Sequence, residues 1–294
     1  MQMFKGAITA IVTPFKENGS IDEESLRNLV EFQIKNKIDG IVPCGTTGES
    51  PSLSEKEHIS VIKTVVESSR GKTQVIAGAG SNSTSHAVEL TRHAADIGAN
   101  AALHVTPYYN KPTQEGLYRH FHEIAKEVDI PIIIYNIQGR TAVNMETSTL
   151  SRLAREHSNI VGVKEASGNM AQMMDVISSL PKEFCVLSGD DNLTLPLMSL
   201  GGKGVISVAS NIIPKEMHDL VRYCLNSDFN KARDLHYRLL PLFKGIFIET
   251  NPIPIKAALA MKGLIKESYR LPMCAMKSEN KEKLRKILEE LGII

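Results

Sequence analysis

The repeating unit of this chain is plainest between residues 40 and 78, which contain Gly40-Ile41-Val42-Pro43-Cys44, then Ser54-Glu55-Lys56-Glu57, then Gln74-Val75-Ile76-Ala77-Gly78. The first and last runs are short, apolar and rich in β-branched residues, which is typical of buried strands. Ser54 and Glu57 have the spacing of a capping box, so a helix is predicted to begin there. This segment therefore predicts a strand, a helix and a second strand.

The same alternation continues in both directions along the chain. Strands are predicted at residues 6–13, 40–44, 74–78, 101–106, 131–136, 160–165, 184–188 and 204–208. Segments of helical period lie between them, and Asp22 is the predicted cap of the first. Eight such units in about 225 residues fit a (β/α)₈ (TIM) barrel, whereas a doubly wound sheet has fewer strands and a nucleotide fingerprint. The predicted fold is thus an α/β barrel.

The strand signals stop after the eighth unit, and the rest of the chain has a helical pattern. Helices are predicted at residues 229–248, 253–263 and 278–291, with Pro252 and Pro254 marking a boundary. We therefore expect a catalytic barrel at residues 1–226 and a C-terminal helical domain at residues 227–294.

Composition excludes several classes of protein. The 294 residues are 42% hydrophobic and 23% charged, as in an ordinary globular protein. The formal net charge of +1 gives no overall attraction to nucleic acid or to an anionic membrane, so neither partner is expected. The first six residues lack the features of a secretory signal, and the four cysteines have no paired spacing. A cytoplasmic location is expected.

The most unusual residue is a lysine in the sixth predicted strand, Ile160-Val161-Gly162-Val163-Lys164-Glu165. Alternation predicts that Val161 and Val163 face the helices and that Lys164 faces the barrel interior. Catalytic groups of such barrels lie at the C-terminal ends of the strands. A desolvated lysine there can attack a carbonyl and form a Schiff base. Alternatively, Lys164 reaches solvent or pairs with Glu165.

Other candidate groups fall at the same ends of neighbouring strands. Tyr135 follows the pattern of the fifth strand and could exchange protons with Lys164, or it could be a core tyrosine. Residues 45–50, Gly-Thr-Thr-Gly-Glu-Ser, form a turn suited to a carboxylate or a phosphate, unless they are merely a tight turn. Glu49 stands where a phosphate loop has lysine, which disfavours nucleotides. Arg140 offers a fork for a carboxylate, or lies on the surface.

A metal site is not predicted. The nine histidines lie mainly in helical segments and lack HxH or HExxH spacing. His104, in the fourth strand, is interpreted as a core histidine. Asp190 and Asp191 lack a third carboxylate in register, so the chemistry is expected to need no metal and no cofactor.

Seven motifs in order resemble those of the dihydrodipicolinate synthase family, which belongs to the pyruvate-dependent class I aldolase, or N-acetylneuraminate lyase, superfamily. They cover nearly the whole chain: residues 45–50 (GTTGES), 107–112 (PYYNKP), 135–141 (YNIQGRT), 162–166 (GVKEA), 188–191 (SGDD), 204–207 (GVIS) and 251–254 (NPIP). The resemblance implies condensation of pyruvate with L-aspartate 4-semialdehyde in the diaminopimelate route to lysine.

The resemblance also implies roles for particular residues. Lys164 would form the Schiff base with pyruvate, and a proton relay would consist of Tyr135, Thr46 and Tyr109, the last contributed by a neighbouring subunit. Substrate would be bound by Thr47, at the pyruvate carboxylate, by Arg140, at the semialdehyde carboxylate, and by the backbones of Gly189 and Ile206. Members of the family are usually homotetramers built as dimers of dimers.

Two other functions remain open. A related retro-aldolase would cleave a sugar-derived 2-keto acid such as N-acetylneuraminate or a 2-keto-3-deoxy sugar acid, but Arg140 and the motif at residues 107–112 favour the synthase. Gln138 stands where synthases commonly have proline, beside the second-substrate site. A non-catalytic homologue is disfavoured because the four catalytic residues are all present.

Feedback inhibition by lysine is a separate question. Positions that bind the effector in lysine-sensitive members match at Ser50, His58, Asn82 and Tyr108. Glu55 replaces a histidine, however, and His86 replaces the carboxylate that holds the effector's α-amino group. Loss of this charge-assisted contact predicts weak or absent inhibition.

Overall fold

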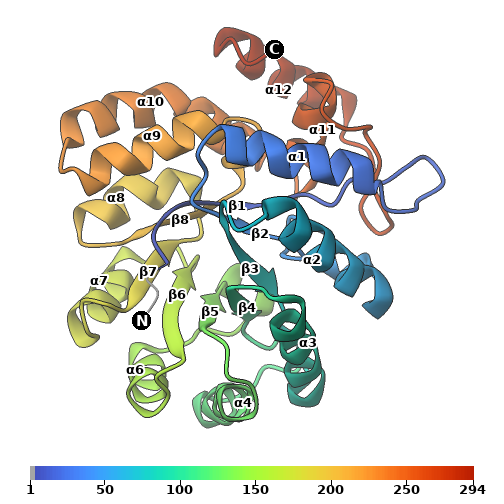
Figure 1. The fold of residues 1–294 in the computed structure, drawn as a ribbon. Coiled ribbons are helices and arrows are strands. Elements are labelled where there is room, and N and C mark those ends of the chain that lie inside the picture. The colour runs from blue at the N-terminus through green and yellow to red at the C-terminus, as the bar shows by residue number, and fades with distance from the viewer. Residues whose placement is uncertain (1–3) are drawn as a thin grey trace.

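The computed structural model describes residues 4–294, and its centre is a closed barrel of eight parallel strands that pair in sequence order (Figure 1). The predicted (β/α)₈ fold is confirmed. The strands are β1 Gly6–Ala10, β2 Gly40–Val42, β3 Gln74–Gly78, β4 Ala101–Val105, β5 Ile132–Asn136, β6 Ile160–Glu165, β7 Cys185–Ser188 and β8 Gly204–Ser207. Residues 1–3, part of the segment examined for a secretory signal, lie outside the described residues.

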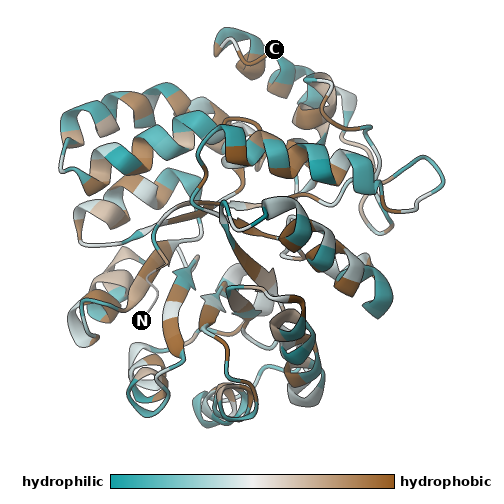
Figure 2. Cartoon of the chain, viewed as in Figure 1, coloured by the Kyte–Doolittle hydropathy of each residue, from teal (hydrophilic) through white to brown (hydrophobic). Residues whose placement is uncertain are grey.

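Helices surround the barrel on its outer side. They are α1 Glu23–Lys35, α2 Glu55–Ser69, α3 Thr84–Ile97, α4 Gln114–Glu127, α5 Gln138–Thr141, α6 Thr147–Glu156, α7 Met170–Ser179, α8 Thr194–Ser199 and α9 Pro214–Leu225. The two predicted helix starts are confirmed: the Asp22 carboxylate accepts from the amide of Ser25, and Ser54 and Glu57 form a reciprocal capping box. Figure 2 shows hydrophobic strands in the centre and hydrophilic outer helix faces.

The sixth strand contains a register shift that corrects one prediction. Ile132 of β5 pairs with Ile160, but the next residue, Ile133, pairs with Gly162, so β6 has one extra residue at this point. Val161 therefore packs in the interior of the barrel rather than against the helices. Beyond the shift, alternation is restored as predicted, with Val163 among the outer residues and Lys164 directed inward.

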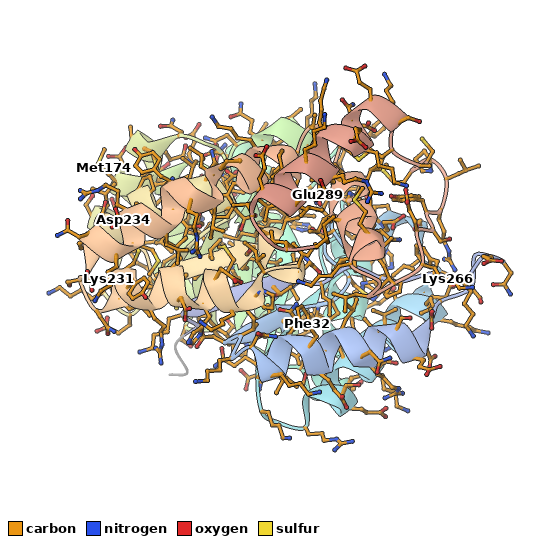
Figure 3. The ribbon with its side chains drawn as sticks, turned by 90° about the horizontal axis from the view of Figure 1, so that it is seen from above. Phe32, Met174, Lys231, Asp234, Lys266 and Glu289 are labelled. Carbon is orange, nitrogen blue, oxygen red and sulfur yellow. The ribbon has the colours of Figure 1, made fainter. Side chains whose placement is uncertain are left out.

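Three further helices follow α9: α10 Phe229–Gly245, α11 Ile253–Met261 and α12 Ser278–Glu290. Each begins where the sequence predicts and ends one to three residues earlier. They pack on one another and on one side of the barrel, as Figure 3 shows from above. The domain boundary between residues 226 and 227 stays a prediction. Within residues 4–294, no helix is both long and apolar enough to cross a membrane.

The barrel closes where β8 meets β1, through a pair of glycines. Gly6 pairs with Gly204, and the Gly6 amide donates to the carbonyl of Lys203 at 2.9 Å. A Cβ atom on Gly204 would lie 2.0 Å from the Gly6 carbonyl oxygen, and one on Gly6 would meet the Asp39 side chain. The seam thus requires the absence of side chains at both positions.

We predict that Gly204→Ala will destabilise the protein by more than about 3 kcal/mol, because the added methyl group overlaps backbone rather than a movable side chain. Thermal unfolding of soluble protein is the measurement. Gly98→Ala is the matched control, since Gly98 also has a positive φ (90°) but open space around its Cβ position. Gly98→Ala should lower the free energy of unfolding by only ~1–2 kcal/mol, the cost of a left-handed backbone conformation for alanine. Equal losses in both variants would contradict the close approach at the seam.

Candidate active site

Lys164 lies near the C-terminal end of β6 with its amine inside the barrel. Its side chain is only 5% exposed, and Nζ lies 4.0 Å from the centre of the Tyr135 ring. Burial lowers the pKa of Lys164 to about 8, and the carboxylates of Asp190 and Asp191 oppose this shift in part. A substantial fraction of the amine is therefore neutral, and nucleophilic, near pH 8.

The alternative of a salt bridge between Lys164 and Glu165 is wrong. The Glu165 carboxylate points away from Lys164 and accepts from Asn136 Nδ2 at 3.2 Å, from the Ser167 amide at 3.0 Å and from Gln172. Within the described residues, Lys164 forms no salt bridge. Its cationic form is thus poorly stabilised, which is the requirement for a reactive amine.

Tyr135 is fixed beside Lys164 by strand pairing, because the two residues are register partners on β5 and β6. Its side chain is 6% exposed. Burial raises the pKa of Tyr135, while Arg140 and the hydroxyl of Thr46 act in the opposite direction. The phenol therefore stays protonated at neutral pH, so it is available as a proton donor next to the amine.

The two aspartates after β7 have different environments. Asp191 is buried, and its carboxylate accepts from the Ser207 hydroxyl and from the amides of Val208 and Ala209 at 3.1 and 3.0 Å. It therefore joins the ends of β7 and β8. Asp190 has no such set of donors, and burial raises its pKa while Lys164 lowers it. Of the two carboxylates, Asp190 has the larger effect on the pKa of Lys164.

The carboxylate-binding turn after β2 is held by a residue from the C-terminal part of the chain. Thr47 is 2% exposed, and its hydroxyl accepts from Asn251 Nδ2 at 3.0 Å. The backbone carbonyl of Asn251 accepts from Arg140 at 3.2 Å. One residue between α10 and α11 thereby positions both predicted carboxylate sites.

A buried ion pair anchors the same turn. Lys256 in α11 is 0% exposed, and its Nζ donates to Glu49 Oε1 at 2.5 Å. The Phe15 ring lies 4.3 Å from the amine, and the Arg270 amide also donates to Glu49. Glu49 has a positive φ of 53°. The lysine that is absent from the turn itself is therefore supplied by a distant helix, but it neutralises Glu49 and does not point to a phosphate.

Arg140 and Thr46 line a cavity of about 510 Å³ that extends outward from the barrel mouth. Its outer part contains the residues that the sequence links to lysine inhibition: Ser50, Glu55, His58, Asn82, His86 and Tyr108. Arg140 is exposed, at the end of the short helix α5, where its guanidinium can meet a carboxylate.

Gly189 and Ile206 are associated with the last two strands, β7 and β8, of which β8 closes the barrel against β1. The Gly189 amide donates to the carbonyl of Glu165 at 2.7 Å, and a Cβ atom there would come within 2.4 Å of Ala166 Cβ. Ile206 is fully buried in the inner cluster of the barrel. Gly189 thus directly follows β7, and Ile206 lies within β8; their contribution to a pocket stays a prediction.

Tyr109 does not join this group within one chain. It lies in the loop after β4, with a positive φ of 72° and 91% of its side chain exposed. The loop is held by Asn82 and Asn110, whose side-chain amides donate to the Tyr108 and Asn82 carbonyls. An ordered but outward-directed tyrosine is compatible with a role in another copy of the chain.

His104 faces α3, where its Nε2 lies 3.2 Å from the Thr91 hydroxyl, and burial lowers the pKa of His104 to about 3. It is a core histidine, as predicted. The four cysteines are free thiols; Cys274 alone is exposed.

Comparison with known proteins agrees with this geometry. The sequence matches the model of the Dihydrodipicolinate synthetase family over residues 3–291. The chain belongs to this family.

Similar family members are found among both sequences and structures. A 4-hydroxy-tetrahydrodipicolinate synthase of Hydrogenobaculum sp. (strain Y04AAS1) is 54% identical over 99% of this chain and 100% of its own. The crystal structure of dihydrodipicolinate synthase from Aquifex aeolicus is 52% identical, covers 99% of both chains and has a TM-score of 0.97. The chloride-inhibited synthase of Acinetobacter baumannii, complexed with pyruvate, is 45% identical over 99% of both chains, also with a TM-score of 0.97.

Sequence reasoning missed the anchoring residues Asn251, Glu49 and Lys256. Asn251 carries no local signal beyond its place in the motif at residues 251–254, because its partners Thr47 and Arg140 lie more than 100 positions away in the sequence. Lys256 did carry a signal: it is a single charge in the otherwise apolar helix Ile253–Met261. A lysine in such a helix requires a buried acid as partner.

We predict that Lys256→Met will lower the free energy of unfolding by about 3–5 kcal/mol, because it leaves the Glu49 carboxylate buried without a counter-charge. The double variant Glu49→Gln/Lys256→Met should regain much of this loss. A double-mutant cycle on thermal unfolding measures the coupling.

Lys266→Met is the matched control. Lys266 pairs with Glu17 on the surface at 2.9 Å, and both side chains are mostly exposed (Figure 3 labels Lys266). Its loss should change stability little. A Lys256→Met protein as stable as the control would refute the anchoring role of the buried pair.

Proposed function

We propose that the chain is a 4-hydroxy-tetrahydrodipicolinate synthase, a Schiff-base lyase that condenses pyruvate with L-aspartate 4-semialdehyde in the diaminopimelate route to lysine. The observation that carries this proposal is the unpaired, buried amine of Lys164 next to the phenol of Tyr135. Full-length relatives that are named as this synthase favour it over the retro-aldolase of sugar-derived 2-keto acids.

The first half of the reaction joins pyruvate to the enzyme. The neutral Lys164 amine attacks the keto carbon, and the carbinolamine that results loses water to form an imine. Tyr135 donates and accepts the protons of these steps through Thr46, whose hydroxyl influences the Tyr135 pKa. The protonated imine then loses a proton from the pyruvate methyl group and becomes an enamine.

The second half forms the carbon–carbon bond and frees the lysine. The enamine carbon attacks the aldehyde carbon of the semialdehyde, and the aldehyde oxygen takes up a proton to become the hydroxyl group. The amino group of the semialdehyde then attacks the imine carbon and displaces Lys164, which closes the ring. Thr47 binds the pyruvate carboxylate and Arg140 the semialdehyde carboxylate.

We also propose a homotetramer in the cytoplasm, in which each site receives Tyr109 from a neighbouring subunit. The exposure of Tyr109 in the single chain, together with its fixed backbone, supports this assignment. Gly189 and Ile206 shape the pocket beside β7 and β8. The expected partners are thus the two substrates and further copies of this chain.

Lys164→Ala should abolish covalent trapping of pyruvate by borohydride, since no other amine replaces the nucleophile. Intact mass and peptide mapping locate the adduct, and turnover of aspartate semialdehyde is followed on the same sample. Wild-type protein should carry the adduct on Lys164 and turn the semialdehyde over.

Lys164→Arg is the control that keeps the positive charge, and it should also fail to be trapped. With wild-type protein, trapping should accelerate as pH rises through about 8, because the neutral amine attacks. If the wild-type protein formed the adduct but did not turn over aspartate semialdehyde, the sugar-acid aldolase would become the better assignment. Undiminished turnover by Lys164→Ala or Lys164→Arg would refute the role of Lys164 as the nucleophile.

Tyr109→Phe tests the exchange of residues between subunits. Alone it should lower kcat by at least ~100-fold, the usual contribution of a positioned proton donor. Mixed with Lys164→Ala under conditions of subunit exchange, it should restore about a quarter of wild-type activity, because half of the dimers are hybrids and each hybrid has one complete site. Turnover that does not rise on mixing would exclude a shared site.

Lysine should inhibit the wild-type protein weakly or not at all, because His86 offers no carboxylate to an α-amino group and Glu55 replaces a histidine. Initial rates at increasing lysine concentrations measure this. His86→Glu should increase the sensitivity, and Tyr237→Glu, at an exposed residue of α10 outside the cavity, should not. Strong inhibition of the wild type at low lysine concentration would contradict the prediction.

A further inference from the structure

Two histidines and a glutamate converge on the outer side of the barrel, outside the proposed active site. His122 comes from α4, Glu156 is the last residue of α6, and His157 follows it. One ligand atom from each lies within 4.8 Å of the other two, and His157 Nε2 is 2.8 Å from His122 Nδ1. The histidines are half-buried and the glutamate is exposed.

The end of α6 explains how two consecutive residues reach one point. Neighbouring residues on a helix point about 100° apart. His157, however, leaves the helix with φ −126° and ψ 107°, so its ring turns toward α4. The following loop is attached to the end of α4, since Asn159 donates to the carbonyls of Ala125 at 2.9 Å and Val128 at 3.2 Å. Helix α4 and the segment after α6 are therefore joined beside the cluster, which fixes the positions of its residues.

A phenol and a guanidinium orient the third group. Tyr118, one turn before His122 on α4, donates to Glu156 Oε2 at 2.5 Å and lies 3.3 Å from His122 Nδ1. Arg152 stacks on the Tyr118 ring and contacts the other oxygen of Glu156 at 3.3 Å. Its charge is shared with Glu115 at 3.0 Å, so the neighbourhood is not strongly cationic.

The contact between the two histidines defines what each ring offers. A hydrogen bond between two imidazole nitrogens needs one proton and one free lone pair, so His157 Nε2 and His122 Nδ1 share a single proton across 2.8 Å. Both nitrogens therefore face the same point, where two lone pairs could meet a metal ion in place of that proton.

We propose that His122, Glu156 and His157 bind a divalent transition-metal ion of the Zn²⁺ type. Two imidazole nitrogens and one carboxylate oxygen suit Zn²⁺ and disfavour Mg²⁺ and Ca²⁺, which prefer oxygen ligands. When the ion binds, the shared proton moves to the other nitrogen of the ring that carries it, so that both facing nitrogens present lone pairs. Tetrahedral geometry at ordinary Zn–N lengths needs these two nitrogens to separate from 2.8 Å to about 3.3 Å.

This site has a structural role, because it lies at the other end of the barrel from Lys164. The C-termini of α4 and α6 adjoin the N-terminal ends of the next strands, opposite the face where the catalytic groups lie. A bound ion would join α4 to α6 without approaching the substrates. The proposal is therefore independent of the proposed function.

Isothermal titration of chelator-stripped, full-length protein with ZnCl₂ tests it. All proteins carry Cys274→Ser, which removes the exposed thiol as a competing ligand. The parent should bind one ion per chain, and His157→Ala and His122→Ala should each weaken binding at least ~tenfold. Glu156→Gln should weaken Zn²⁺ binding as well, and because Glu156 is exposed this variant carries little risk to folding.

The matched control is His93→Ala, because His93 is a half-buried histidine that also faces a glutamate, Glu55, at 3.6 Å. It should bind Zn²⁺ as the parent does, and saturating Zn²⁺ should raise the thermal midpoint of the control but not of His157→Ala. Equal affinities in all variants, or no binding by the parent, would overturn the proposal. Schiff-base trapping should be the same in all of them.

Discussion

Closure of the eight-stranded sheet is the constraint on which the rest of the molecule depends. When β8 pairs with β1, every strand has two neighbours, and the interior becomes a dry space at whose rim only a few polar groups can be accommodated. The glycine pair Gly6 and Gly204 lets the last strand approach the first. Without closure, the Lys164 amine would be hydrated and would keep the high pKa of an ordinary lysine.

The reactivity of the Lys164 amine also depends on the hydrogen bonds of the neighbouring Glu165. Glu165, the nearest carboxylate in sequence, is occupied by Asn136, Ser167 and Gln172 on the outer side of the strand. Alternation along β6 thus separates the acid from the base, although the two residues are consecutive. Lys164 can therefore act as a nucleophile, because β6 directs the carboxylate of Glu165 away from the amine.

The sequence predicted the parts of this architecture that local periodicity determines. Strand positions, helix caps and the inward direction of Lys164 follow from spacing alone, and Tyr135, the turn at residues 45–50 and Arg140 become candidates through their place at strand ends. The roles of Tyr109, Gly189 and Ile206 come only from the resemblance to the family. Val161 was predicted wrongly because an extra residue in β6 leaves no local signal. Asn251 and the pair of Glu49 and Lys256 depend on contacts more than 200 positions apart, which no periodicity reports. The cluster of His122, Glu156 and His157 could not be predicted from the sequence, because it depends on the backbone conformation of His157 after the end of α6.

The buried pair of Glu49 and Lys256 has a consequence for how the protein is made. The two residues are separated by 207 positions, so during translation the turn that carries Thr46 and Thr47 leaves the ribosome long before its anchor. Folding during synthesis begins at the N-terminus. Until Lys256 has been synthesised, the carboxylate of Glu49 in the barrel has no counter-charge. Catalytic competence is therefore acquired only with the last part of the chain, and an unfinished polypeptide has no complete site in which to use its lysine.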